Sequence, residues 1–169
     1  MRKLTFILIF MAFFVWSCGG GGSEESKSGG KKVVIVKKNK VYVTGEKEAE
    51  EVLKAYSEKN KDVIKGYASG MFKNVIGDDF FDSSTVRYYL KFIDKWDGDI
   101  REVRYKTREV TFEKTYYASA CYSGDPKSDK KLYTIALKSK DKKNWKIVMN
   151  GLASIKTDKF LKMSSTMPE

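Results

Sequence analysis

Two cysteines, Cys18 and Cys121, are the side chains of this sequence most open to covalent chemistry. A thiol can close a disulfide, act as a nucleophile or carry an attached lipid, and its neighbours decide which. Histidine is absent from the 169 residues. This absence excludes imidazole-based catalytic triads, histidine metal sites and a histidine pH switch.

The residues before Cys18 indicate an export signal that ends in lipidation. Arg2 and Lys3 are followed by the apolar run "LTFILIFMAFFVW". A membrane span takes about 20 residues, so this shorter run is typical of a signal peptide. The stretch "VWSC" that ends at Cys18 resembles the bacterial lipobox, in which an aliphatic residue, a small residue and an invariant cysteine direct lipidation and cleavage. The resemblance implies that residues 1–17 are a lipoprotein signal peptide. It also implies that Cys18 begins the mature protein and carries diacylglyceryl and N-acyl (palmitate-type) chains.

Residues 18–32, "CGGGGSEESKSGGKK", are predicted to form a flexible tether, because glycine and serine favour neither helix nor strand. An uncleaved anchor with an incidental cysteine is the alternative, and the glycine tract argues against it. Two or more acyl chains hold a protein firmly on a bilayer, with about 0.8 kcal/mol for each buried CH₂. We therefore expect a protein lipid-anchored to a membrane of the bacterial cell envelope, on the extracytoplasmic side.

Cys121 lies in "SACYS" and has no cysteine partner once Cys18 is acylated. A buried free thiol that packs as a small apolar side chain is the expected state. A redox or nucleophilic role is the alternative, for which the sequence offers no adjacent base.

The remaining chain predicts a single α+β domain at residues 33–160 and a C-terminal tail at 161–169. A hydrophobic content of 41% with 14% aromatic residues is typical of a globular chain. Apolar residues at helical spacing predict three helices, at 49–56, 63–75 and 86–96.

Strands are predicted after the helices, because apolar and polar residues then alternate. Four strands, near 103–112, 116–123, 132–140 and 145–155, are separated by short polar turns, which predicts an antiparallel meander. A change of parity in the first strand predicts a bulge near Arg108 and Glu109. The segment "VVIVKKNKVYVTG" at 33–45 is compatible with an additional N-terminal β-hairpin.

This order of elements resembles the nuclear transport factor 2-like superfamily, especially its small bacterial lipoproteins of unknown function. The resemblance rests on "EKEAEEVLKAYSEKN" in the first helix and on "DKKNWKIVMNGL" at the last strand. It implies a cystatin-like cone, in which three helices pack on a curved four-stranded sheet. Members of the superfamily use the mouth of the cone as an enzyme pocket or as a binding site, so the resemblance implies a fold and not one function.

The ketosteroid isomerase branch of that superfamily uses a tyrosine and aspartates inside the cone, and this chemistry needs an inward carboxylate. The last three predicted strands contain no Asp or Glu. In the first strand Glu102, Glu109 and Glu113 alternate with apolar residues, so we expect them to face solvent. An isomerase-like or hydrolase-like enzyme that uses a tyrosine and a carboxylate therefore stays the alternative to a non-catalytic protein.

Asp94, Asp97 and Asp99 in "DKWDGD" could bind calcium. Their spacing lacks the alternating ligands of a calcium loop, which favours solvated side chains at a helix end. We expect neither a metal site nor a cofactor.

Aromatic side chains are the most suggestive candidates for a ligand pocket. Packing in the core is the simpler role for them, but a pocket in this domain would draw its walls from the same set, since aromatic walls with a few hydroxyls suit small amphipathic ligands. The candidates on predicted inward faces are Tyr56, Tyr67, Tyr89, Trp96, Tyr105, Tyr133 and Trp145.

A formal net charge of +11 would suggest nucleic acid as a partner in the cytosol. In the cell envelope the relevant polyanions are lipid headgroups and cell-wall polymers, so nucleic acid is not expected. Lysines crowd the last predicted hairpin, where they form either a solvated coat or a contact with anionic surfaces. They are Lys138, Lys140, Lys142, Lys143 and Lys146.

The sequence thus predicts a membrane-anchored envelope lipoprotein whose cone domain binds a partner protein or a small apolar ligand without catalysis. The two alternatives are the tyrosine–carboxylate enzyme and a lysine-rich adaptor for anionic envelope surfaces.

Overall fold

The computed structural model describes residues 40–169. The predicted signal peptide, the lipidation site Cys18, the tether and most of the possible N-terminal hairpin lie outside these residues, and Lys40–Val43 form no strand. Asn39–Glu169 form one compact unit. Every buried side chain named below belongs to it, so a chain that begins at Asn39 keeps the whole core.

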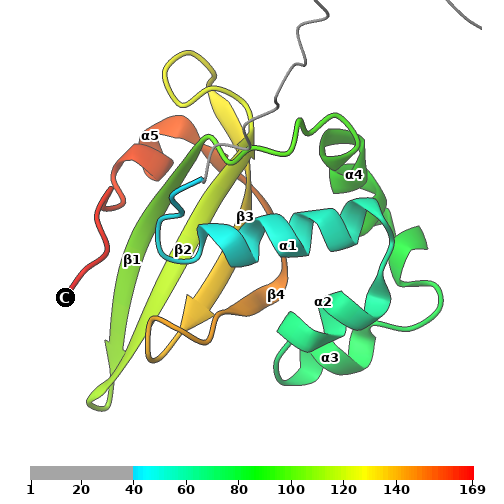
Figure 1. Ribbon diagram of the computed structural model, residues 1–169, viewed down its shortest axis with the longest axis horizontal. Coiled ribbons are helices and arrows are strands. Elements are labelled where there is room, and N and C mark those ends of the chain that lie inside the picture. Colours follow the sequence, from blue (N-terminus) through cyan, green and yellow to red (C-terminus); the bar gives the residue numbers. More distant parts are fainter. Residues whose placement is uncertain (1–39) are drawn as a thin grey trace, which may run out of the picture. The chain divides into compact units, whose positions relative to one another are not determined.

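The four predicted strands are confirmed as one antiparallel sheet (Figure 1). They are β1 (Glu102–Val110), β2 (Glu113–Ser123), β3 (Lys131–Ser139) and β4 (Lys146–Lys156), and they lie in the order β1-β2-β3-β4. The short turns between consecutive strands impose this meander, because each turn pairs a strand with the next one in the chain.

The helices precede the sheet, except for one short helix at its end. They are α1 (Glu46–Ser57), α2 (Lys61–Tyr67), α3 (Met71–Val75), the 3₁₀ turn η1 (Phe80–Asp82), α4 (Ser84–Ile93) and α5 (Thr157–Leu161). The first and third predicted helices are confirmed as α1 and α4. The single helix predicted at 63–75 is wrong, since Ala68 is extended and Gly70 has a φ of 57°, so the chain breaks into α2 and α3. Only glycine adopts that φ readily, and helical spacing alone did not reveal the break.

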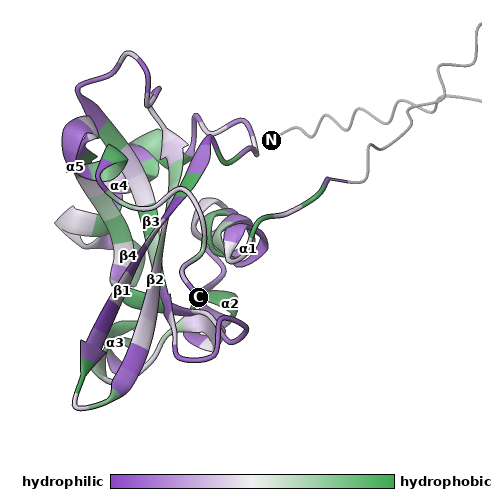
Figure 2. Cartoon of the chain, turned by 90° about the vertical axis from the view of Figure 1, so that its left-hand side faces the viewer, coloured by the Kyte–Doolittle hydropathy of each residue, from purple (hydrophilic) through white to green (hydrophobic). Residues whose placement is uncertain are grey.

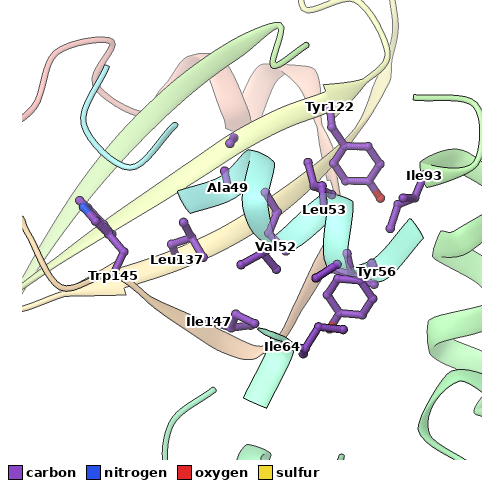
Figure 3. Close-up of a cluster of buried hydrophobic side chains, with 14 of the residues drawn as sticks. Ala49, Val52, Leu53, Tyr56, Ile64, Ile93, Tyr122, Leu137, Trp145 and Ile147 are labelled. Atoms are coloured by element: carbon purple, nitrogen blue, oxygen red, sulfur yellow. The ribbon is translucent and has the colours of Figure 1, made fainter. Parts of the chain in front are cut away.

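The main core lies between α1 and one face of the sheet. Figure 3 shows Val52 of α1 near Leu137 of β3 and Ile147 of β4, and Leu53 of α1 near Tyr122 of β2. These side chains and Tyr56 of α1 are fully or almost fully buried. In α1, Tyr56 follows Leu53 by three residues and Val52 by four, which places the three side chains on one side of the helix. The apolar spacing that predicted α1 is therefore the spacing that builds the core.

The bulge predicted near Arg108 and Glu109 is wrong. The β1–β2 register runs without interruption from Glu102 opposite Cys121 to Val110 opposite Glu113. Residues 108–112 are all exposed, because this end of the hairpin extends past the core (Figure 1). Alternation disappears there because no apolar layer faces the strands.

Cys121 is buried, as expected, and it is unpaired among residues 40–169. It packs with Leu132 of β3 and Phe160 of α5, while its neighbour Tyr122 belongs to the main core. Successive side chains of a strand point to opposite faces, so α5 covers the face opposite α1. Burial is the main cause that raises the pKa of the Cys121 thiol to about 11, so the thiol is protonated at neutral pH.

The segment predicted as a C-terminal tail lies along the outer edge of β1. The Tyr105 N–H donates to the Ser164 carbonyl over 2.8 Å, and the Ser164 N–H donates to the Tyr105 carbonyl over 3.0 Å. The Arg104 guanidinium donates to the Met163 carbonyl over 3.0 Å. The two backbone bonds satisfy groups of Tyr105 that an edge strand would otherwise leave open.

The Tyr122 hydroxyl is buried and has no hydrogen-bond partner among the described residues. Because an unsatisfied buried hydroxyl loses its hydration without compensation, Tyr122→Phe is expected to raise the free energy of unfolding by about 1 kcal/mol. Urea denaturation measures this change. Tyr56→Phe is the matched control: the Tyr56 hydroxyl donates to the Asn150 carbonyl over 2.7 Å, and its loss is expected to destabilise the fold by about 1 kcal/mol. Equal destabilisation by both substitutions would contradict this account.

Candidate binding groove

A groove of about 1040 Å³ opens between α3, the start of α4 and the sheet strands β3 and β4. Its walls are largely apolar, with a few polar side chains. The lining residues that the argument uses are Met71, Phe72, Val75, Phe80, Lys138 and Met149. A concave, mostly apolar surface with few polar groups is typical of small-molecule sites.

A large bulge in β4 forms one wall of the groove. Ile135 of β3 pairs with Leu152, but Leu137 pairs with Ile147, so residues 148–151 face the single residue 136. Met149 within the bulge has a φ of 54° and is 80% exposed. Bulges re-aim side chains beside functional sites, and here the bulge turns a methionine out of the strand and into the groove.

Gly151 makes the bulge possible. Its φ is 72°, and an added Cβ would lie 2.6 Å from Ile147 Cγ2 and 2.8 Å from Ile135 Cδ1. A side chain at this position would therefore be strained twice, by the left-handed backbone and by the two isoleucines.

Tyr56 fixes the bulge from the side of α1. Its ring is fully buried, and its hydroxyl donates to the Asn150 carbonyl over 2.7 Å. Burial raises the pKa of this hydroxyl above its ordinary value, so it stays a hydrogen-bond donor throughout the physiological range. One tyrosine thus ties the first helix of the domain to the irregular part of its last strand.

The opposite wall comes from α3, which the break at Gly70 separates from α2. Met71 is 84% exposed and Val75 is 64% exposed, although both belong to the apolar pattern that predicted a helix at 63–75. Met71, Val75 and Met149 all line the same groove. Large apolar side chains from two separate elements are thus exposed around one concavity.

Aromatic rings form the inner part of the groove. Phe72 and Phe80 meet edge to face with centroids 5.9 Å apart, and Phe80 lies 6.0 Å from Tyr56. Phe80 and Phe81 are both buried. The apolar base of the groove is therefore continuous with the rigid core.

The polar lining of the groove consists of one cation, two carboxylates and small hydroxyl or amide side chains. Lys138 contributes the charge from β3, and Asp79 and Asp82 contribute theirs from η1 and the residue before it. Among the described residues, no tyrosine lines this groove. Instead, Tyr67 donates a hydrogen bond to Glu51 between α2 and α1.

The structure places the seven aromatic candidates elsewhere than on the walls of this groove. Tyr56, Tyr105 and Trp145 are buried, and the Tyr105 hydroxyl donates to the Thr44 carbonyl over 2.8 Å. Trp96 is half-buried, and its Nε1 donates to the Asp99 carbonyl over 2.7 Å. Tyr67 is half-buried beside Glu51.

The remaining two, Tyr89 and Tyr133, meet in an aromatic cluster between α4 and β3. Tyr133 stacks on Phe92 at 3.7 Å, and its hydroxyl lies 3.4 Å from that of Tyr88. The hydrogen bond with Tyr88 is the main cause that raises the pKa of Tyr133 to about 12 and lowers that of Tyr88.

The predicted lysine cluster is divided among different partners. Lys138 lines the groove, and the Lys146 ammonium donates to the Gly66 carbonyl over 2.8 Å. Lys140 pairs with Glu113 at 2.6 Å. Lys142 lies over the Tyr116 ring at 4.7 Å. Lys143 is exposed.

Two of the three aspartates that could bind calcium have other partners. Asp97 pairs with Arg101 at 2.6 Å, and Asp99 pairs with Lys40 at 3.3 Å. Asp94 is exposed. Within residues 40–169, no group of three or more potential ligands is arranged to hold a metal ion. In the same residues, no helix combines the length and hydropathy of a membrane span.

Sequence reasoning missed the residues that line the groove, above all Met71, Val75 and Met149. One signal was present: Asn150-Gly151 interrupts an apolar strand pattern, and such a pair indicates a bulge. No family model, curated protein or solved structure matches this chain.

Proposed function

We propose that this protein is a lipid-anchored component of the bacterial cell envelope whose domain binds a small amphipathic ligand in the groove, without catalysis. The lipobox-like sequence at Cys18 and the glycine-rich tether support the anchor. The groove supports the choice of a small ligand over a partner protein, because concave sites suit small molecules whereas protein interfaces are broader.

We also propose that the domain is a cone of the nuclear transport factor 2-like type. Helices followed by a four-stranded antiparallel meander support this assignment, as does α1, which lies across the sheet in Figure 1. The groove would then be the mouth of the cone, between the short helices and the end of the sheet.

The observation that carries the proposed function is the β4 bulge. Its backbone is irregular at Met149 and Gly151, and it is held by Tyr56. The result is an exposed methionine that lines the same concavity as Met71. Methionine is flexible and polarizable, so paired methionines can adapt to the shape of an apolar chain.

The groove composition favours binding over catalysis. A tyrosine–carboxylate enzyme would bring both groups to one reacting centre. The described groove offers Asp79 and Asp82 without a tyrosine, and the Tyr67–Glu51 pair lies outside it. The apolar walls instead suit an acyl chain, and the Lys138 ammonium can pair with an anionic headgroup at the β3 side of the groove, across from Asp79 and Asp82 of the η1 segment.

A dansyl-labelled undecanoate tests this function directly with the chain that begins at Asn39. We expect a rise and blue shift of dansyl emission that saturates at one site per domain. Met149→Glu should weaken binding at least about tenfold, because it places a charge where the acyl chain lies.

Val41→Glu is the matched control, because Val41 is exposed and does not line the groove. It should leave the affinity unchanged. Equal loss of binding in both variants, or no saturable binding by the unchanged domain, would contradict the proposed function. If a purified envelope protein without lipid displaced the bound dye, the groove would instead be the site of a protein partner.

A further inference from the structure

The turn between β1 and β2 exposes an aromatic side chain at the tip of a projecting hairpin. Thr111 and Phe112 join Val110 to Glu113 as a two-residue turn. Phe112 is 95% exposed and Val110 is 54% exposed. Figure 2 shows this tip as a hydrophobic end between hydrophilic strand segments.

The backbone of this turn is unfavourable for its residues. Thr111 has a φ of 50° and Phe112 a φ of 65°, which corresponds to the primed turns that suit asparagine and glycine. A β-branched or bulky side chain at positive φ is strained. Burial within the domain does not offset this strain, because Phe112 is exposed. A stabilising contact of this side chain must therefore come from another molecule.

The surface around the tip is basic. Residues 106–116 and 138–146 contain eight Lys or Arg side chains and three carboxylates, whereas the other described residues are almost balanced, with eighteen and seventeen. Lys114 and Lys142 lie 5.6 and 4.7 Å from the Tyr116 ring centroid. Lys140 pairs with Glu113, and Lys114 also donates to the Glu169 carbonyl. The positive surplus of the domain is thus concentrated in the hairpin end that carries the exposed phenylalanine and in the neighbouring turn between β3 and β4.

We propose that this tip binds the surface of an anionic lipid bilayer, with Phe112 and Val110 in the headgroup region and Lys114, Lys140 and Lys142 against the phosphates. Aromatic side chains favour the interface of a membrane, and lysines near an anionic surface are attracted to it. A narrow convex tip buries its apolar area against a fluid headgroup layer, while a protein partner would need a pocket of matching shape. The proposal is independent of the ligand groove.

Vesicle sedimentation of the chain that begins at Asn39 tests the proposal. We expect binding to vesicles of equimolar phosphatidylglycerol and phosphatidylcholine, weak binding to phosphatidylcholine alone, and release by salt. Phe112→Gly should reduce binding about tenfold by removing the apolar insertion. The same substitution should raise Tm by about 3 °C, because glycine relieves the strain of the turn. A purely structural role for Phe112 predicts a lower Tm.

Phe112→Trp provides a second readout, since brominated lipids should quench its added emission if the tip enters the bilayer. A combined replacement of Lys140, Lys142 and Lys143 by glutamine should reduce binding by roughly tenfold or more. The matched control replaces Lys156, Lys159 and Lys162 by glutamine, and this change removes the same amount of charge near α5. Equal loss in the two triple variants, unchanged binding of Phe112→Gly, or an unquenched Phe112→Trp would overturn the proposal. Binding of the tip to a protein, without any binding to lipid, would also overturn the proposal.

Discussion

Gly151→Ala is expected to lower the free energy of unfolding by about 3 kcal/mol, a large fraction of the stability of an ordinary domain. The added Cβ would lie 2.6 Å from Ile147 Cγ2 and 2.8 Å from Ile135 Cδ1, at a φ of 72°. Real Cβ atoms do not approach so closely, so either the bulge or both isoleucines must move. Urea denaturation followed by circular dichroism measures the loss.

Gly66→Ala is the control for this prediction. Gly66 lies in α2, and nothing stands within 4 Å of its added Cβ. Because alanine favours a helix more than glycine does, this substitution should stabilise the domain by roughly 0.5–1 kcal/mol. A Gly151→Ala variant as stable as the unchanged chain would show that the β4 bulge is not fixed as described.

Cys18→Ser is expected to abolish lipid attachment completely in the full chain. The thiol of Cys18 is the only side chain in the lipobox-like sequence that can form the thioether with diacylglycerol. In a bacterium that processes lipoproteins, labelled palmitate should enter the unchanged protein and not this variant. Mass spectrometry of the N-terminal peptide should find residues 1–17 removed and Cys18 acylated in the unchanged protein.

Cys121→Ser is the matched control, since Cys121 is buried in the folded domain. Its labelling should equal that of the unchanged protein. An unmodified Cys18 behind an intact Met1, or a loss of label in Cys121→Ser, would contradict the lipid anchor.

The helices and strands could be predicted because their apolar spacing serves the core. In α1, Val52, Leu53 and Tyr56 follow helical spacing and all three are buried. In β3, Leu132, Thr134 and Ile135 are buried together with Leu137, although the alternation is imperfect. Where a pattern is maintained by burial, the sequence reports it.

The groove could not be predicted in the same way, because its walls break the rules that made the core predictable. Met71 and Val75 continue a helical apolar pattern, yet they are exposed because the chain breaks between α2 and α3. A rule based on apolar spacing assigns such residues to the core and does not predict a concave surface. The aromatic candidates show the converse: Tyr56 and Trp145 were proposed for a pocket and are buried.

The projecting turn shows a third limit. Val110 and Phe112 suggested a bulge because they shifted the parity of apolar residues in the first strand. The register of β1 with β2 is regular, and both side chains are exposed. Parity reports the buried face only where a core lies beneath the strand.

Methionine methyl groups offer the most direct test of the central claim, that the groove between α3 and the β4 bulge binds a small amphiphile. The chain that begins at Asn39 contains Met71 and Met149 in the groove and Met163 and Met167 outside it. With ¹³C-methyl methionine, titration with the dansyl-labelled undecanoate should shift the Met71 and Met149 signals together, with one dissociation constant. The Met163 and Met167 signals should stay in place. Shifts confined to Met163 and Met167, or no saturable shift of any methionine, would contradict the account.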